Sequence, residues 1–217
     1  MKLLHSAKTH SPKAYYCNSF HPYMNYLAHA YLSFNLPEIL VGNMISDFVK
    51  GKRKYNYPEE IQKGIALHRA IDEFTDTHPV TKEARKIFQQ HYGLYSAVFM
   101  DVVYDHFLAT DLQEFTDDSL LEFSIGTYTM LDTYESMFPE RFKLIYPYMK
   151  QYNWLYNYKT TIGIQRSFEG ISYRALYMSE SNTAFRLFKE NYEELKAQYA
   201  TFFPSLKVFA FDNLQTS

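Results

Sequence analysis

The stretch GIALHRAIDEFTDTHP, residues 64–79, is the feature that most constrains how this chain can fold. It reads as the later part of a helix that begins near Pro58, since proline suits the first helical position and the two acids that follow suit the first turn. At about 100° per residue, His68, Asp72 and Thr75 share one narrow stripe of this helix. The stripe continues an apolar face made by neighbouring isoleucines. We therefore expect an imidazole and a carboxylate to point into a helical core.

Two interpretations of this His–Asp pair are open. It can be a hydrogen bond between His68 and Asp72 that satisfies two buried groups and fixes the core. It can also belong to a metal or phosphate site, because a neutral imidazole and an ionised carboxylate four residues apart can share one cation. The other segments of the chain decide between the two.

Composition favours long helices. The 217 residues include only 7 Gly and 8 Pro, and 47% of them are hydrophobic. So few turn-forming residues argue against a many-turned β protein, and alternating strand patterns are scarce. We predict an all-α fold, with a single domain of about eight helices at residues 24–212 after a disordered extension at residues 1–23.

Charge and cysteine content restrict the partners. The formal net charge of −2 gives no overall attraction to nucleic acid or to an anionic membrane, so electrostatic recognition must be local. No apolar run reaches membrane-spanning length, and residues 1–23 lack the apolar centre of a signal peptide. The single Cys17 excludes an intrachain disulfide and a cysteine-rich zinc module. We predict a cytoplasmic protein with neither nucleic-acid nor membrane partners.

The segment after Pro37 carries a polar pair and leads into a basic loop. Asn43 and Asp47 are four residues apart and share a face of a predicted helix that Gly51 ends. The loop contains four cations: Lys50, Lys52, Arg53 and Lys54. Such a run is either a solvated connector or a surface for an acidic partner.

Residues 94–111 are apolar nearly all round, which predicts a buried helix. This segment nevertheless contains Asp101, Asp105 and His106. Ionisable groups in so apolar a helix are costly unless they are paired or bind a metal. Asp101 and Asp105 share a face, whereas His106 points about 100° away from Asp105.

Four segments taken together closely resemble the acyl carrier protein phosphodiesterase family: MNYLAHAYLS, GNMISDFVKG, GIALHRAIDEFTD and DVVYDHFL. The resemblance runs from Met24 to about Phe209 and includes the later WLYNY and IQRSFEGISYR. Such proteins are similar to the HD phosphohydrolases, all-helical enzymes that place His and Asp side chains around one or two divalent metals. The resemblance implies hydrolysis of the phosphodiester that joins 4′-phosphopantetheine to a serine of holo-acyl carrier protein. It also implies an acidic carrier protein as partner and a divalent metal as cofactor, Mn²⁺ first, with Mg²⁺ or Fe²⁺ as alternatives.

The resemblance also implies roles for individual residues. The implied metal ligands are His29, His68, Asp72 and Asp105. The implied catalytic residues are Asp47 as general base or further ligand, His106 as the acid for the leaving serine, and Arg69 and Arg174 on the phosphate oxygens. The implied substrate contacts are Asn43, Asp76 and Asp101. Charge, rather than the resemblance, makes the four cations of the basic loop the candidate surface for the acidic carrier protein.

Alternatives remain at two levels. Arg69 can form a salt bridge with Asp76 instead of binding phosphate. Some family members carry a second histidine two residues after the first, where this chain has Tyr31. For the whole protein, the same residues fit an HD-type phosphohydrolase of a nucleotide or other small phosphoester. They also fit a non-catalytic helical module in which these groups form a buried polar network.

Overall fold

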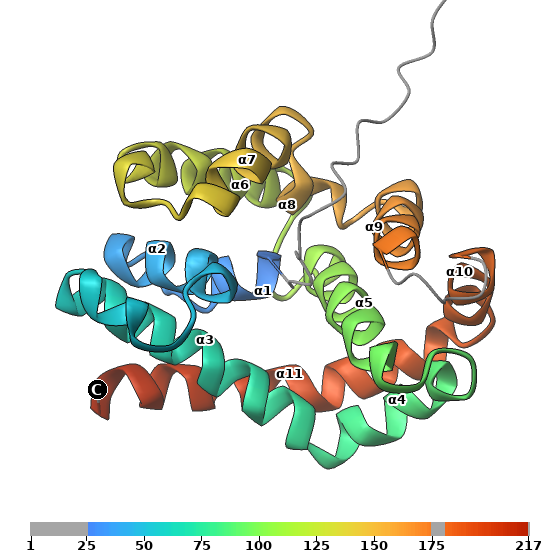
Figure 1. Cartoon of the computed structure of the whole chain (residues 1–217). Coiled ribbons are helices and arrows are strands. Elements are labelled where there is room, and N and C mark those ends of the chain that lie inside the picture. The colour runs from blue at the N-terminus through green and yellow to red at the C-terminus, as the bar shows by residue number, and fades with distance from the viewer. Residues whose placement is uncertain (1–25, 175–180, 217) are drawn as a thin grey trace, which may run out of the picture.

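The structure, a computed structural model, describes residues 26–174 and 181–216, without the side chains of residues 172–174 and 181 (Figure 1). Eleven α-helices and no strand occur in these ranges, and eight of the helices have ten residues or more, so the predicted all-α class is confirmed. The predicted extension at residues 1–23 lies outside the described residues. The α-helices are α1 (Tyr26–Tyr31), α2 (Pro37–Ile45), α3 (Glu59–Thr77), α4 (Pro79–Tyr92), α5 (Ser96–Thr110), α6 (Asp117–Asp132), α7 (Glu140–Gln151), α8 (Trp154–Asn157), α9 (Thr161–Arg174), α10 (Ser181–Glu190) and α11 (Tyr192–Thr216). Short 3₁₀ helices are η1 (Ser46–Phe48), η2 (Gly51–Asn56), η3 (Gly93–Tyr95) and η4 (Glu135–Met137).

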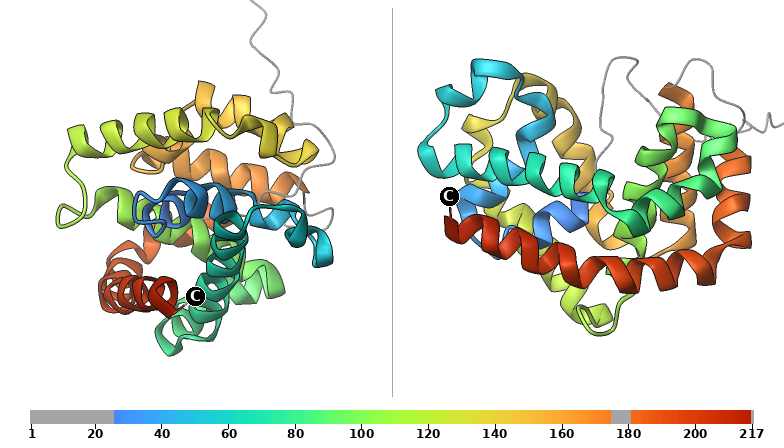
Figure 2. Two further views of the ribbon diagram at one scale, coloured as in Figure 1. Left: turned by 90° about the vertical axis from the view of Figure 1, so that its left-hand side faces the viewer. Right: turned by 90° about the horizontal axis from the view of Figure 1, so that it is seen from below.

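The helices are arranged around α1, α2 and α5 (Figure 1). α6, α7 and α8 lie above α1 and α2, and α3 lies below them. α11 runs along α3 and α4 on the lower side, as the view from below shows (Figure 2). α9 and α10 pack together at the other end, where α9 contacts α5. As predicted, α5 is buried on nearly every side.

The helix predicted after Pro37 has a different end in the structure. The α-helix after Pro37 stops at Ile45, and Asp47 lies on the 3₁₀ turn η1, whose Ser46 hydroxyl donates to the Ile65 carbonyl of α3 at 3.3 Å. Gly51, predicted to end that helix, begins η2 with a φ of +57°. α10 and α11 are separated at Asn191, whose side chain donates to the Leu187 carbonyl and so caps α10.

α2 and α3 cross at a pair of glycines. A Cβ on Gly42 would lie 2.1 Å from a carbonyl oxygen of α3, and a Cβ on Gly64 would lie 2.3 Å from a carbonyl oxygen of α2. No side chain fits at such distances, so the two backbones touch because both positions are glycine. His68 lies one turn beyond Gly64, and the crossing brings Asp47 against it.

No helix in residues 26–174 or 181–216 is both long and apolar enough to cross a membrane.

Candidate metal centre

Two histidines and two aspartates converge where α1, η1 and α3 meet. His29 Nε2 lies 3.3 Å from Asp72 Oδ1, and His68 Nε2 lies 3.2 Å from Asp72 Oδ2. His68 Nε2 is also 3.3 Å from Asp47 Oδ1. The two imidazole rings stack with their centroids 3.9 Å apart. We call these four residues the His–Asp cluster.

The cluster is closed on its histidine side and open on its aspartate side. The side chains of His29 and His68 are 0% and 2% exposed, whereas those of Asp72 and Asp47 are 47% and 35% exposed. Helical spacing explains why one histidine lies beside one aspartate, because His68 and Asp72 are one turn apart on the same face of α3. Water and a ligand can therefore approach through the carboxylates.

The cluster has the donors that a divalent metal needs. One donor atom from each of His29, His68 and Asp72 lies within 4.8 Å of the other two. Both ring nitrogens of His29 and Nδ1 of His68 are buried without a hydrogen-bond partner among the described residues; the 3.3 Å contact to Asp72 lacks hydrogen-bond geometry. A buried polar atom left unpaired costs about 1–3 kcal/mol. Imidazole nitrogens and carboxylate oxygens are ligands for divalent first-row metals, so these residues fit such an ion.

The electrostatics of the cluster are dominated by its carboxylates. Burial lowers the pKa of His68, but Asp47 and Asp72 outweigh burial and raise that pKa to about 10. Burial and the neighbouring His68 lower the pKa of His29 more than Asp72 raises it. The pKa of Asp72, which burial alone would raise, is held below its usual range by the two histidines. Burial, with the charges of Asp72 and other acids, raises the pKa of Asp101 well above its usual range. Asp47 and Asp72 thus favour positive charge on His68, and the same two carboxylates would favour a bound cation.

Asp105 lies outside the cluster, although the sequence predicts it as a ligand. Its side chain is fully buried, and its two oxygens accept the backbone N–H groups of Leu27 and Ala28 at 3.1 and 2.8 Å. These are first-turn amides of α1, which have no acceptor within their own helix. Asp105 therefore caps the helix that carries His29.

His106 also lies outside the cluster, although it is the predicted acid. Its Nδ1 lies 2.8 Å from the Tyr158 carbonyl, and its Nε2 lies 3.1 Å from the Tyr192 hydroxyl. Because a carbonyl only accepts, Nδ1 carries the proton and Nε2 accepts from Tyr192. The ring packs edge-on against Phe188. These contacts explain His106 as a buried group that joins α5 to the later helices.

The remaining predicted residues divide between the rim and the scaffold. Arg69 is exposed and donates from Nη2 to the Val49 carbonyl at 2.8 Å; the alternative bridge to Asp76 is not formed, since Asp76 pairs with Arg85. Asp101 is half-buried and has no hydrogen bond or ion pair among the described residues. The side chain of Arg174 lies outside the described residues.

Asn43 and Ser33 both bind the backbone of His29, and the sequence analysis did not identify Ser33. The His29 carbonyl accepts from Asn43 Nδ2 at 2.9 Å and from Ser33 Oγ at 2.7 Å. A serine in a helix often donates to the carbonyl four residues before it, so the spacing of His29 and Ser33 could have predicted this bond. Tyr31 leaves α1 on another side, where its hydroxyl donates to Glu114.

The basic loop is exposed. Lys50, Lys52 and Arg53 are exposed and Lys54 is half-buried, and none of the four forms an ion pair with the described residues. Their cationic groups are therefore available to a partner. The loop follows η1 directly, so it lies next in the chain to Asp47.

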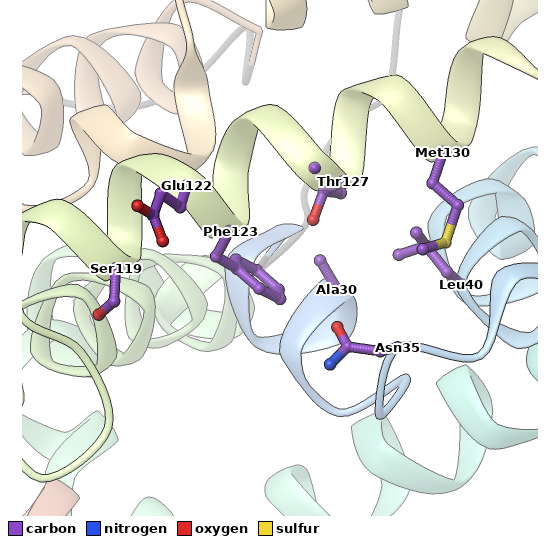
Figure 3. Close-up of a pocket in the computed structure, with 9 residues that line it drawn as sticks. Ala30, Asn35, Leu40, Ser119, Glu122, Phe123, Thr127 and Met130 are labelled. Atoms are coloured by element: carbon purple, nitrogen blue, oxygen red, sulfur yellow. The ribbon is translucent and has the colours of Figure 1, made fainter.

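A separate cavity of about 340 Å³ lies between α6 and the α1–α2 region (Figure 3). Its lining includes Leu40, Phe123 and Met130, with Asn35 at the turn after α1. None of the four residues of the His–Asp cluster lines it. The cavity and the cluster are thus distinct features.

A family model described as acyl carrier protein phosphodiesterase matches residues 24–206. The chain belongs to this family. Similar proteins include the acyl carrier protein phosphodiesterases of Yersinia pestis, 32% identical over 184 residues, and of Pectobacterium atrosepticum, 30% identical over 188 residues. These alignments cover 84% and 86% of this chain, and 95% and 97% of the two relatives. No solved structure matches the chain.

Membership in the acyl carrier protein phosphodiesterase family confirms the resemblance predicted from the four segments, and with it a phosphodiester hydrolase. Three of those segments supply the whole His–Asp cluster: the first carries His29, the second Asp47, and the third His68 and Asp72. The fourth supplies Asp105 and His106, which lie outside it. Similarity to the HD phosphohydrolases stays a prediction.

Proposed function

We propose that this protein hydrolyses the phosphodiester joining 4′-phosphopantetheine to a serine of holo-acyl carrier protein, giving apo-acyl carrier protein and 4′-phosphopantetheine. Membership in the acyl carrier protein phosphodiesterase family supports the substrate. The observation that carries the chemistry is the His–Asp cluster, with buried imidazoles on one side and accessible carboxylates on the other.

His29, His68 and Asp72 would hold a divalent metal, with Asp47 as a further ligand or as the general base. We propose Mn²⁺ as that metal, with Mg²⁺ or Fe²⁺ as alternatives, because mixed imidazole and carboxylate donors suit such ions. When bound, the metal supplies a water of lowered pKa and screens the phosphate charge.

The protein's own residues orient the reactants around this centre. Asp47, 3.3 Å from His68 and one-third exposed, is the carboxylate best placed to accept a proton from the attacking water. Arg69 is anchored through one nitrogen to the Val49 carbonyl, and its other N–H groups have no partner among the described residues. They are therefore available to phosphate oxygens. Asp101 and Asp76 stay candidates for contact with the substrate, and Arg174 for contact with its phosphate.

The basic loop is the proposed docking surface for the carrier protein. Acyl carrier protein is acidic, whereas this chain has a formal net charge of −2 and would repel it without a local positive surface. The four unpaired cations next to Asp47 provide one. We place the reaction in the cytoplasm, in keeping with the single Cys17.

The test is to incubate purified protein and Mn²⁺ with holo-acyl carrier protein and to weigh the carrier by mass spectrometry. The proposal requires loss of one 4′-phosphopantetheine group and its appearance in solution. An unchanged carrier together with hydrolysis of nucleotides or other small phosphoesters would favour the HD-type alternative. An unchanged carrier and no bound metal would favour a non-catalytic module.

A further inference from the structure

The two histidines of the His–Asp cluster lack the support that ligand histidines usually have. A histidine that binds a metal through one ring nitrogen ordinarily donates from the other to a carbonyl or carboxylate, which fixes the ring orientation. Here Nδ1 of both His29 and His68 is buried without a partner among the described residues. Something other than a hydrogen bond to Nδ1 must hold the rings in place.

His68 has an evident support, since it lies near the middle of the 19-residue α3. His29 does not, because α1 has only six residues. So short a helix is unstable by itself, and its position depends on contacts with the rest of the protein. The orientation of His29 is therefore set by whatever fixes α1.

Asp105 fixes the start of α1. This fully buried carboxylate reaches from α5 and accepts the amides of Leu27 and Ala28 at 3.1 and 2.8 Å. Ala28 directly precedes His29, so the second bonded amide belongs to the residue before the candidate ligand. Two hydrogen bonds from neighbouring amides to the two oxygens of one buried carboxyl group define both the position and the direction of the start of α1.

Asn43 fixes the other side of His29. Its Nδ2 donates to the His29 carbonyl at 2.9 Å and to the Ser33 hydroxyl at 3.1 Å, and the side chain is fully buried in α2. The backbone of His29 is thus held from α5 before the residue and from α2 after it.

We infer that Asp105 and Asn43 are positioning residues, which orient the His29 imidazole for metal through its backbone rather than through its second ring nitrogen. The inference rests on the proposed metal centre. It makes the affinity of the centre for metal depend on Asp105 and Asn43, which are not members of the His–Asp cluster.

The test compares metal affinity with stability in Asp105→Asn, Asn43→Ala and a control, Phe99→Leu. An asparagine keeps one acceptor oxygen but turns an amide group toward the second backbone N–H, so one of the two bonds is lost. Phe99 is a fully buried residue of α5 whose ring packs against Phe88 of α4 and Phe168 of α9, so its replacement weakens the packing of the same helix and leaves the two hydrogen bonds from α1 to Asp105 in place. The measurements are Mn²⁺ dissociation constants by calorimetry and melting temperatures in chelator.

Both positioning variants should bind Mn²⁺ about 10–100-fold more weakly, the usual effect of removing support from a metal ligand. Phe99→Leu should melt earlier and keep the affinity of the wild type. Equal affinity in the wild type and a folded Asp105→Asn would overturn the inference, as would equal weakening in Phe99→Leu. Should Asp105→Asn fail to fold, Asn43→Ala decides by the same criterion. Absence of Mn²⁺ binding to the wild type would instead overturn the proposed metal centre, and the inference with it.

Discussion

Removing divalent metal should lower the melting temperature of this protein. His29 Nε2 is buried without a hydrogen bond to the described residues, which costs about 1–3 kcal/mol that coordination would remove. A ligand bound only by the folded state, at about one hundred times its dissociation constant, raises the free energy of unfolding by about 2.7 kcal/mol. Chains of this size lose about 2–4 °C of melting temperature per kcal/mol. We therefore expect Mn²⁺ to raise the melting temperature by about 5–11 °C over chelated protein.

The assay is scanning calorimetry of protein stripped with chelator, shown free of metal by elemental analysis, and then supplied with Mn²⁺. His29→Leu is the matched control, because leucine fills a similar volume without buried nitrogens. Its melting temperature in chelator should stay within about 6 °C of the wild type, since volume-conserving core changes cost less than about 1.5 kcal/mol. Addition of Mn²⁺ should not raise the melting temperature of His29→Leu. If stripped wild-type protein melts at the same temperature with and without Mn²⁺, the reasoning from the unpaired nitrogens is wrong.

Three further predictions concern the reaction. Asp47→Ala and His68→Ala should each lower kcat/KM by at least about 100-fold while the circular dichroism spectrum stays helical. Loss of a group that only supports a metal ligand costs about 10–100-fold, and loss of a group that contacts the metal should cost more. Near-normal turnover by a folded Asp47→Ala would exclude Asp47 from the centre. Changing residues 52–54 to glutamate should raise KM for holo-acyl carrier protein and leave turnover of a small phosphodiester unchanged, and the wild-type KM should climb with ionic strength. A triple variant that processes the carrier normally at low salt would make the loop a solvated connector. His106→Ala should lower the free energy of unfolding by about 1–3 kcal/mol, because the buried Tyr158 carbonyl loses its donor. Its kcat, measured well below the melting temperature, should stay at the wild-type value; lost turnover at full stability would instead support the prediction of His106 as the acid.

Helical periodicity was sufficient to predict the part of the candidate site that lies on one amphipathic helix. His68 and Asp72 interrupt an apolar stripe at a spacing of four, so their shared face follows from the sequence. α5 gives no such information. Because it is apolar on nearly every side, the pattern cannot say which neighbour each polar group meets, and Asp105 proved to meet the amides of α1.

The turn that carries Asp47 was beyond sequence reasoning for another reason. Residues 37–51 continue a helical pattern, whereas the structure changes to a 3₁₀ turn at Ser46, whose hydroxyl donates to the Ile65 carbonyl of α3. That bond joins segments that are separate in the sequence. Tertiary contact, rather than local preference, sets the direction of Asp47.

The glycine crossing of α2 and α3 also sets a lower limit on the size of the metal cage. Gly42 and Gly64 already bring the two backbones into contact, so α2 and α3 cannot approach each other further at this crossing. Mg²⁺ requires ligands at about 2.0–2.1 Å in a nearly ideal octahedron, and here rotation of side chains or movement of η1, rather than closer packing of α2 on α3, would have to contract the site around it. We expect the protein to bind the larger Mn²⁺ more tightly than Mg²⁺, which the ratio of the two dissociation constants measures. Selection by ionic radius would then originate in two residues that have no side chain.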